Sequence, residues 1–410
     1  MRGYLSVVLI ACSAMATAAS AAEQKQAVAA DQCSVSATAT VLQPAQMQAT
    51  DARAHWLNRQ LLKWPKMSGA GRFRLHYSAG AGLLAEKGKP VSGADGALQL
   101  DVTEDELSRD ISERFAFVAD GGVLAVRRGD AQRVPDLLTQ QVLLVQEDEA
   151  GRVMDATLLQ VAGVLDDVYA GAAQEPALGG SAGAQGTGFK LWAPTARRVS
   201  LCLQAQDGTS VVPETPLRLD PATGIWSIQQ PGDLSGNYYT YLVDVVVPGL
   251  GVVRNRVTDP YSISLDANSK RSYIANLDAP ALKPEGWDAA NAPSKVAAQT
   301  DMVIYELHVR DFSISDASVT PANRGKYGAF AESGSQGMQH LRALSEAGMT
   351  DVHLLPIFDF ATVPESNCVT PKVPVAAADS EAQQAAVMAV AAQDCFNWGY
   401  DPYHFNAPEG

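Results

Sequence analysis

The sequence predicts a multidomain fold: two β-sandwich-like N-terminal domains, followed by the first β-α-β unit of an incomplete (β/α)8 TIM barrel. Short stretches with the two-residue period of half-buried strands recur between residues 51 and 277. After residue 300 the pattern changes to strand, helix and strand, the unit from which parallel sheets and barrels are built. Because a closed barrel needs roughly 250 residues, the stretch 301–410 is too short to complete one.

The N-terminus has the features of an export signal. Arg2 supplies a positive charge, Tyr4–Ala11 form a short apolar core, and the small residues Ala19–Ala22 suit cleavage. The apolar core is too short for a transmembrane anchor. Leu9–Cys12 offers an alternative, a bacterial lipoprotein box whose cysteine would be lipidated. We therefore expect residues 1–22 to be a signal peptide and the chain to be periplasmic or extracellular, or else an outer-membrane lipoprotein.

A flexible leader and a first β domain are expected next. Residues 23–50 are rich in Ala, Gln and Thr and contain few large apolar side chains. From 51 to 170, strand periods occur in the following runs: Phe73–Ser78, Leu98–Val102, Phe115–Val118, Val123–Val126 and Val142–Val145. The segment containing Trp56 and Trp64 is expected to be a short helical or irregular packing segment.

A second β-rich block is predicted over residues 189–277. The stretch 171–188 before it is dominated by Gly, Ala and Ser, a composition typical of a flexible linker. Within the block, Val199–Gln204 alternates apolar and polar side chains, and Tyr238–Val247 is a long strand candidate. Residues 278–300 contain several prolines and are expected to be an extended connector.

The third region, 301–410, is predicted to open a parallel α/β domain. Met302–Arg310 and Val352–Ile357 have the composition of strands. Between them, apolar residues recur every third position from Met338 to Ala347, and Gly348 suits the C-terminal cap of that helix.

Polar residues of this region are candidates for buried networks. Glu306, His308 and Arg310 would share one side of the first strand, where buried charges need partners. Asp311 and Asp359 would follow the strand ends, which is the active face of barrels.

The charge and the histidine content of the chain limit the ligands that can be expected. A net charge of −14 disfavours nucleic acid, which requires clustered Lys and Arg. The six His show no metal-ligand spacing, so no metal site is assigned.

Cys368 and Cys395 bracket one insertion in the same loop and are the expected disulfide, whereas Cys33 and Cys202 are expected to be unpaired.

The richest chemical signal is the aromatic run that begins at Phe396. Together with Ile304–Phe312 and Leu354–Ile357, the run Phe396–Pro402 resembles type I pullulanases of glycoside hydrolase family 13. The signature of that family is tyrosine-asparagine-tryptophan-glycine-tyrosine-aspartate-proline. It is matched except at Phe396, which keeps the ring and loses the hydroxyl.

Two N-terminal segments extend the resemblance over most of the chain. Phe189–Thr195 resembles the start of a family 48 carbohydrate-binding module. The segment Trp56–Val168 is similar to the extra N-terminal domain of pullulanases.

The resemblance implies hydrolysis of α-1,6-glucosidic branch linkages in pullulan, limit dextrins or starch by a retaining mechanism. Such a mechanism uses two carboxylates about 5 Å apart. In the family they lie on barrel strands four and five, with a third Asp after strand seven, whereas only strands one and two are expected here. No catalytic residue is therefore assigned, and the 410-residue chain by itself is expected to be inactive.

What the resemblance does assign is part of a sugar-binding wall. It implies that Tyr400 stacks on the sugar in subsite −1, that Asp401 orients it, and that Trp398 supports the site. The alternative is that Tyr400 packs internally and that Asp401 with Pro402 forms an ordinary turn.

The module offers two weaker candidates for contact with glucan. Trp226, beside Gly224, is expected to be the more exposed, and Trp192 is expected to pack inward. In sandwiches a single Trp is more often part of the core.

The expected partner is an α-glucan polysaccharide, with no nucleic acid, and a membrane only if Cys12 is lipidated. No cofactor is expected, although calcium occurs in some members of the family; no acidic calcium loop is evident. Two alternatives remain: another family 13 debranching or branching enzyme, and a secreted, non-catalytic glucan-binding protein.

Overall fold

The computed structural model describes residues 33, 51–67, 69–183, 185–291, 296–396 and 398–410. The chain separates into two compact units, which we describe one at a time. The first extends to Asp259, and the second comprises Pro260–Gly410 with the short pieces Ser181–Gly183 and Leu234–Gly236. The expected signal peptide, the lipoprotein box at Cys12 and nearly all of the leader lie outside the described residues.

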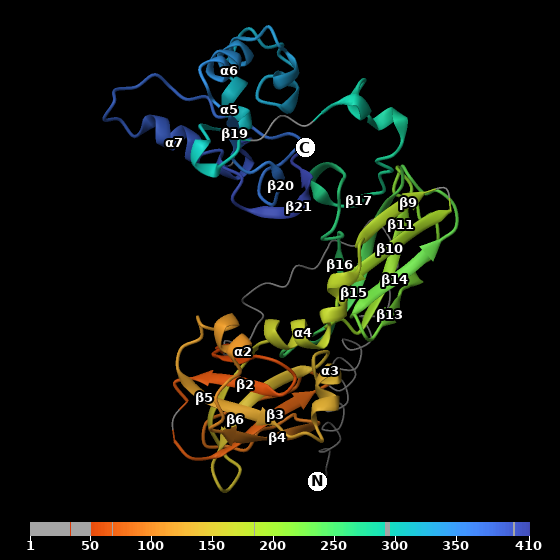
Figure 1. Cartoon of the computed structure of the whole chain (residues 1–410), viewed down its shortest axis with the longest axis vertical. Helices are drawn as coiled ribbons and strands as arrows, with labels where there is room; N and C mark the ends of the chain where they lie inside the picture. Colours follow the sequence, from red (N-terminus) through yellow and green to blue (C-terminus); the bar gives the residue numbers. More distant parts are fainter. Residues whose placement is uncertain (1–32, 34–50, 68, 184, 292–295, 397) are drawn as a thin grey trace, which may run out of the picture. The chain divides into compact units, whose positions relative to one another are not determined.

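The first domain is built on one eight-stranded sheet (Figure 1). Its strands are β1 (Ala54–Trp56), β2 (Leu61–Pro65), β3 (Arg72–Ser78), β4 (Gly96–Thr103), β5 (Gly121–Val126), β6 (Gln141–Glu147), β7 (Val153–Thr157) and β8 (Leu159–Gln160). They pair in the order β7-β6-β3-β4-β5-β2-β1-β8, antiparallel except for β1 with β8. The domain is thus β-rich as predicted, but one continuous sheet replaces the two sheets of a sandwich.

One face of this sheet supplies the core. Alternate side chains of β1 to β6 form a single buried cluster: Trp56, Leu62, Trp64, Phe73, Leu75, Leu98, Leu100, Leu124 and Leu144. The short helices α3 (Val134–Leu137) and α4 (Ala162–Val168) add Val134, Leu137 and Val164 to it. Turns of 3₁₀ helix, η2 (Ala131–Arg133) and η3 (Ala170–Gln174), precede α3 and follow α4.

Two local predictions for this domain are wrong. Trp56 and Trp64 lie on paired strands, where they point into the core while their neighbours His55 and Lys63 are less buried. Residues 115–118 form turns after helix α2 (Arg109–Arg114) instead of a strand, because the Phe115 N–H continues the helical bonding to Ile111 O. Both segments are apolar but have no clear period, so the sequence did not distinguish a strand from a turn or irregular segment.

The second domain contains two sheets. One has the order β13-β14-β10-β9, and the other contains β12-β11-β15-β16 in that order (Figure 1). Their bounds are β9 (Gly179–Gly183), β10 (Gly186–Trp192), β11 (Arg198–Gln204), β12 (Thr215–Pro216), β13 (Arg218–Asp220), β14 (Ile225–Gln230), β15 (Tyr238–Val247) and β16 (Gly251–Val257). The rings of Phe189 and Tyr239, one from each sheet, lie 5.0 Å apart in the core. The segment 171–188, which was expected to be a flexible linker, contains strand β9 and is therefore only partly a linker.

The second unit contains a β-α-β unit. Strand β18 (Ile304–Leu307) pairs in parallel with β19 (Asp351–Leu354), and helix α6 (Gln336–Glu346) lies between them in sequence. Ser335 caps α6 by accepting from the Met338 N–H at 3.3 Å. Before α6 come α5 (Val309–Ser313) and the 3₁₀ turn η8 (Tyr327–Ala331).

The first strand of this unit is shorter than predicted. It ends at Leu307, His308 caps α5, and Arg310 lies inside that helix. Glu306, His308 and Arg310 therefore do not share one side of a strand. The N-cap bond from the Asp311 N–H to His308 Nδ1, 3.3 Å long, satisfies a helix N–H and fixes this early switch to helix.

The second unit contains further short strands and helices before and after the β-α-β unit. The antiparallel pair β20 (Phe358–Phe360) and β21 (Pro402–Pro408) follows β19, with α7 (Ala382–Met388) and η9 (Ala391–Gln393) between its strands. Before β18 come η4 (Ala267–Ser269), β17 (Ser272–Tyr273), η5 (Pro280–Leu282), η6 (Trp287–Ala289) and η7 (Gln299–Asp301). Within the described residues, no helix has the length and apolar character needed to cross a bilayer.

Candidate functional site

The aromatic segment from Phe396 to Tyr403 precedes and enters β21. The rings of Phe396 and Trp398 meet edge to face at 5.3 Å, and the His308 ring lies 5.5 Å and 6.0 Å from them. The guanidinium of Arg310 lies 5.3 Å from the Phe396 ring. Residues at the start of α5 thus contact the aromatic segment. The contact with Arg310 uses the ring of Phe396, so it does not need the hydroxyl of a tyrosine.

Tyr400 projects from this segment with 70% of its surface exposed. The turn before it depends on Gly399, whose φ is +82°, a conformation that side-chain-bearing residues rarely adopt. A Cβ at Gly399 would lie 2.7 Å from the carbonyl oxygen of Pro356 and 2.9 Å from the Phe360 ring. A glycine is therefore required to press the chain against β20 while Tyr400 stays outside.

Asp401 fastens the segment to the loop after β20. Its Oδ2 accepts a hydrogen bond from the Thr362 hydroxyl, and its carbonyl accepts from the Ala361 N–H at 2.9 Å. Its Oδ1 is buried and has no hydrogen-bond partner among the described residues. Of the three residues predicted here, Asp401 is the one held in place, whereas Tyr400 and Trp398, 56% exposed, present open ring surface.

Beneath this loop lies a buried polar network. Asp359 on β20 faces His404 on β21 in the strand register, and its Oδ2 lies 2.6 Å from His404 Nδ1. The Ser269 hydroxyl donates to Asp359 Oδ1, also at 2.6 Å. All three residues are buried, so this carboxylate is compensated at both oxygens.

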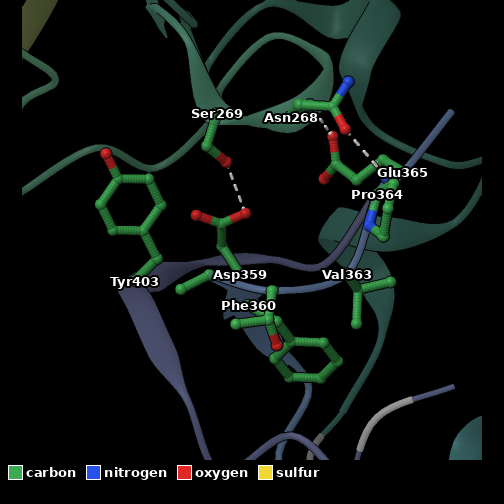
Figure 2. A pocket seen from close by; sticks show the side chains of 10 residues that line it. Asn268, Ser269, Asp359, Phe360, Val363, Pro364, Glu365 and Tyr403 are labelled. Atoms are coloured by element: carbon green, nitrogen blue, oxygen red, sulfur yellow. Dashed lines mark hydrogen bonds between the residues drawn. The ribbon is translucent and has the colours of Figure 1, made fainter. Parts of the chain in front are cut away.

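A pocket of about 230 Å³ opens beside the network (Figure 2). Tyr403 lines one flank, and Asn268 and Glu365 line the other. The carboxylate oxygens of Asp359, Glu365 and Glu409 lie within 4.8 Å of one another. Burial raises the pKa of Glu409 to about 7, and the nearby carboxylates of Glu365, Asp359 and Asp401 add to the effect.

The two tryptophans of the second domain are buried to different extents. Trp226 is buried, and its indole N–H donates to Ala193 O at 3.0 Å, so the expectation that it is exposed is wrong. Trp192 is half-buried against the core cluster of the first domain and donates to Thr223 O at 3.0 Å. Gly224, which suggested an open position, serves a tight turn with φ +71°.

Both cysteine pairs form disulfides. Cys368 is bonded to Cys395, the pair expected from the sequence, and this bond closes the insertion immediately before Phe396. Cys33 is bonded to Cys202, so the expectation that these two are unpaired is wrong. The pair is 169 residues apart and is buried with Leu242, and Gln204 donates to Cys33 O at 3.1 Å. The composition of the leader gave no sign of this contact.

Sequence reasoning missed Ser269, Thr362 and His404 as parts of the site. Asp359 was singled out by its place after a strand, and its partners come from positions 269 and 404. Only the folded chain brings these positions together. An Asn and a Ser in a loop, as at 268 and 269, are ordinary turn residues and carry no distinct signal.

Comparison with known proteins gives a consistent match. Residues 51–167 match the Pullulanase N2 domain, and residues 171–262 match carbohydrate-binding module 48, described as the isoamylase N-terminal domain. A pullulanase from Klebsiella pneumoniae is 34% identical over 401 residues, and pullulanase 1, chloroplastic, from Arabidopsis thaliana is 33% identical over 370 residues. Each alignment covers 88% of this chain, which spans 36% and 37% of those relatives respectively.

Solved structures agree with the sequence matches. The apo pullulanase of Klebsiella pneumoniae has a TM-score of 0.75 at 33% identity, covering 89% of this chain and 43% of that one. The Klebsiella pneumoniae pullulanase complexed with maltotriose gives 0.75 and 33%, covering 89% of this chain and 38% of that one. The similarity includes both β domains and continues into the second unit.

Proposed function

Because this chain belongs to the pullulanase family and carries its N2 domain and a family 48 carbohydrate-binding module, we propose that it contributes to debranching of α-glucans. The proposed reaction is hydrolysis of α-1,6-glucosidic linkages in pullulan, limit dextrins or starch. The observation that carries the proposal is the exposed ring of Tyr400, presented by a glycine-dependent turn and anchored through Asp401. The chain spans little more than a third of its relatives, so the proposal concerns the enzyme to which these domains contribute.

The β-α-β unit is proposed to be the start of a (β/α)8 barrel. Support comes from the parallel pairing of β18 with β19 and from their apolar side chains, among which Ile304, Val352 and Leu354 are exposed. Strands buried on both faces in barrels carry such side chains. The segment from Phe396 would then lie in the loop that follows the second barrel strand.

In this arrangement the residues of the chain bind and orient the sugar. The face of Tyr400 suits the C–H side of a pyranose ring, and its edge leaves the hydroxyls of the sugar to polar partners. Trp398 extends the ring surface, and Asp401 limits the freedom of the turn. The retaining chemistry itself requires two carboxylates about 5 Å apart at the scissile bond, and we assign no residue of this chain to that role.

The first experiment concerns the 410-residue polypeptide. It is expected to release no reducing sugar from pullulan, while pullulan in a native gel retards its migration. Measurable release of reducing ends by the purified polypeptide would contradict this assignment of roles. Retention without hydrolysis is also what a non-catalytic glucan-binding protein would show, so a second experiment is needed to separate the two.

The second experiment is a chimera in which this chain replaces the matching part of the Klebsiella pneumoniae pullulanase. We expect it to cleave pullulan, and Tyr400→Ala to lower kcat/KM at least tenfold, because stacking on the sugar is lost. Tyr400→Phe is the matched control, which keeps the ring and is expected to stay within about threefold of the parent. A chimera that folds but cleaves no pullulan would favour the non-catalytic alternative.

We propose that the protein is exported. Two disulfides in the described residues support an oxidising compartment, because cytosolic thiols are kept reduced. The mass of the mature N-terminus would distinguish the two routes. A start near residue 22 indicates ordinary signal cleavage, a lipid-modified Cys12 indicates a lipoprotein, and an intact Met1 would contradict export.

A further inference from the structure

The turn at Asn268 and Ser269 has an unusual backbone. Both residues adopt left-handed conformations, with φ of 59° and 52°. Two consecutive side-chain-bearing residues in this region are disfavoured, and such a conformation persists only where surrounding contacts fix it. Contacts that hold this turn come from β20 and from the loop after it.

The turn holds that loop at both ends. On β20, directly before the loop, Asp359 accepts a hydrogen bond from the Ser269 hydroxyl at 2.6 Å. At its end, the Asn268 N–H donates to the Glu365 carboxylate, and Asn268 Oδ1 accepts from the Glu365 N–H at 3.1 Å. Asn268 Nδ2 also donates to Ser366 Oγ at 3.1 Å. Figure 2 shows the two residues of the turn reaching Asp359 and Glu365 from the same side.

The middle of the same loop holds the aromatic segment. The Thr362 hydroxyl and the Ala361 N–H both bind Asp401, the residue directly after Tyr400. A second route runs through β21, since Asp359 also pairs with His404 at 2.6 Å. Two hydrogen-bonded routes therefore connect Ser269 with the turn that presents Tyr400.

We propose that Ser269 and Thr362 are positioning residues for Tyr400, and that the strained turn is kept because it sets the orientation of this ring. The inference rests on the proposed function in its reference to sugar, and it adds residues that neither the domain matches nor the motif assigns. Ser269 lies well before β18, so a segment outside the β-α-β unit takes part in shaping the site. A purely local loop contact would stabilise residues 359–366 without affecting residues 399–401.

Amide hydrogen exchange of the 410-residue protein tests the connection directly. Ser269→Ala removes the hydroxyl, and we expect exchange at residues 399–404 to accelerate about tenfold. Ser264→Ala, in the same segment and outside the network, is expected to leave exchange there unchanged. Equal protection of residues 399–404 in both variants would overturn the proposal, whether or not the protein binds sugar.

A conservative pair separates positioning from general packing. Thr362→Val keeps the shape of the side chain and loses the donor to Asp401, so it is expected to behave like Ser269→Ala. Thr362→Ser keeps the donor and is expected to restore protection. If the two Thr362 variants exchange equally, the hydroxyl does not position the segment and the proposal fails.

Affinity for maltotriose, measured by calorimetry, gives the functional readout. Ser269→Ala and Thr362→Val are expected to weaken binding by at least threefold, while Thr362→Ser and Ser264→Ala bind like the parent. Unchanged affinity in the first two variants would contradict the proposal. Absence of binding in the parent would count against the proposed function, and the exchange result would still decide the connection between Ser269 and Tyr400.

Discussion

The first domain and the β-α-β unit have similar apolar strands and use them in opposite ways. In the first domain, six strands bury one face in a single cluster, and Leu75, Leu124 and Leu144 have no exposed surface. In the β-α-β unit, Ile304 is 56% exposed, and helix α6 buries none of its residues. The second unit is instead fixed by a disulfide and by the polar network around Asp359.

This difference shows where each part obtains its stability and its role. An apolar cluster stabilises a domain by removing a large apolar area from water. A buried polar network contributes less net free energy, but it fixes the positions of groups, which a binding surface requires. The candidate site lies in the part with the weaker core.

The largest expected effect concerns the two disulfides. Replacing Cys33 and Cys202 by Ala should destabilise the first unit by about 5 kcal/mol. Without the cross-link the unfolded chain gains entropy, and this gain grows with the length of the loop that the disulfide closed. Replacing Cys368 and Cys395 by Ala should cost the second unit about 3.5 kcal/mol, since only 27 residues separate them. Urea unfolding of the oxidised parent and of each double variant measures both. Equal losses would argue against the chain-entropy explanation.

A core substitution tests the comparison most simply. Leu144→Ala should destabilise the first domain by about 3 kcal/mol, because it leaves a cavity in a fully buried cluster. Leu354→Ala, on the partly exposed strand β19, should cost less than about 1 kcal/mol. Unfolding followed by hydrogen exchange within each unit reports both values. A similar loss of stability at the two positions would show that β19 is buried to the same extent as β6.

The smallest effect is a pH dependence of the second unit. Because the pKa of Glu409 is raised to about 7 from 4.5, the folded unit binds a proton that the unfolded chain releases at intermediate pH. This contribution is full below about pH 4.5 and is lost as the pH rises through about 7. After allowance for solvent screening at a half-buried group it amounts to about 1 kcal/mol.

Thermal unfolding at pH 5.5 and pH 8 checks this dependence, with the second unit expected to be more stable at pH 5.5. Glu409→Gln should remove most of the difference, and Glu381→Gln, on an exposed loop beside α7, serves as the control. A difference that persists in Glu409→Gln would assign the dependence to other groups.

Local patterns in the sequence were enough to predict several elements. The alternation at Phe73–Ser78, the helix face from Met338 and the pairing of Cys368 with Cys395 depend on neighbours in the chain or on one loop. Contacts between distant segments could not be read in this way. The bond from Cys33 to Cys202 spans 169 residues, and the one from Ser269 to Asp359 spans 90.

The tryptophans show the same limit for exposure. The nearby Gly224 suggested that Trp226 is exposed, but its indole is buried in the core and donates to a carbonyl oxygen there. Tyr400 was expected to lie in a loop, and the structure places it there with its ring exposed. Its exposure follows from the fit of Gly399 against Pro356, a contact between two segments.

The most direct test of the central claim is an NMR titration of the 410-residue protein with maltotriose, in which amide resonances are followed along the chain. We expect shifts concentrated at residues 398–401 and their loss in Tyr400→Ala, with the parent pattern kept in Tyr400→Phe. Shifts confined to the second domain, or an unchanged response in Tyr400→Ala, would contradict the claim that the aromatic segment is the sugar-binding wall.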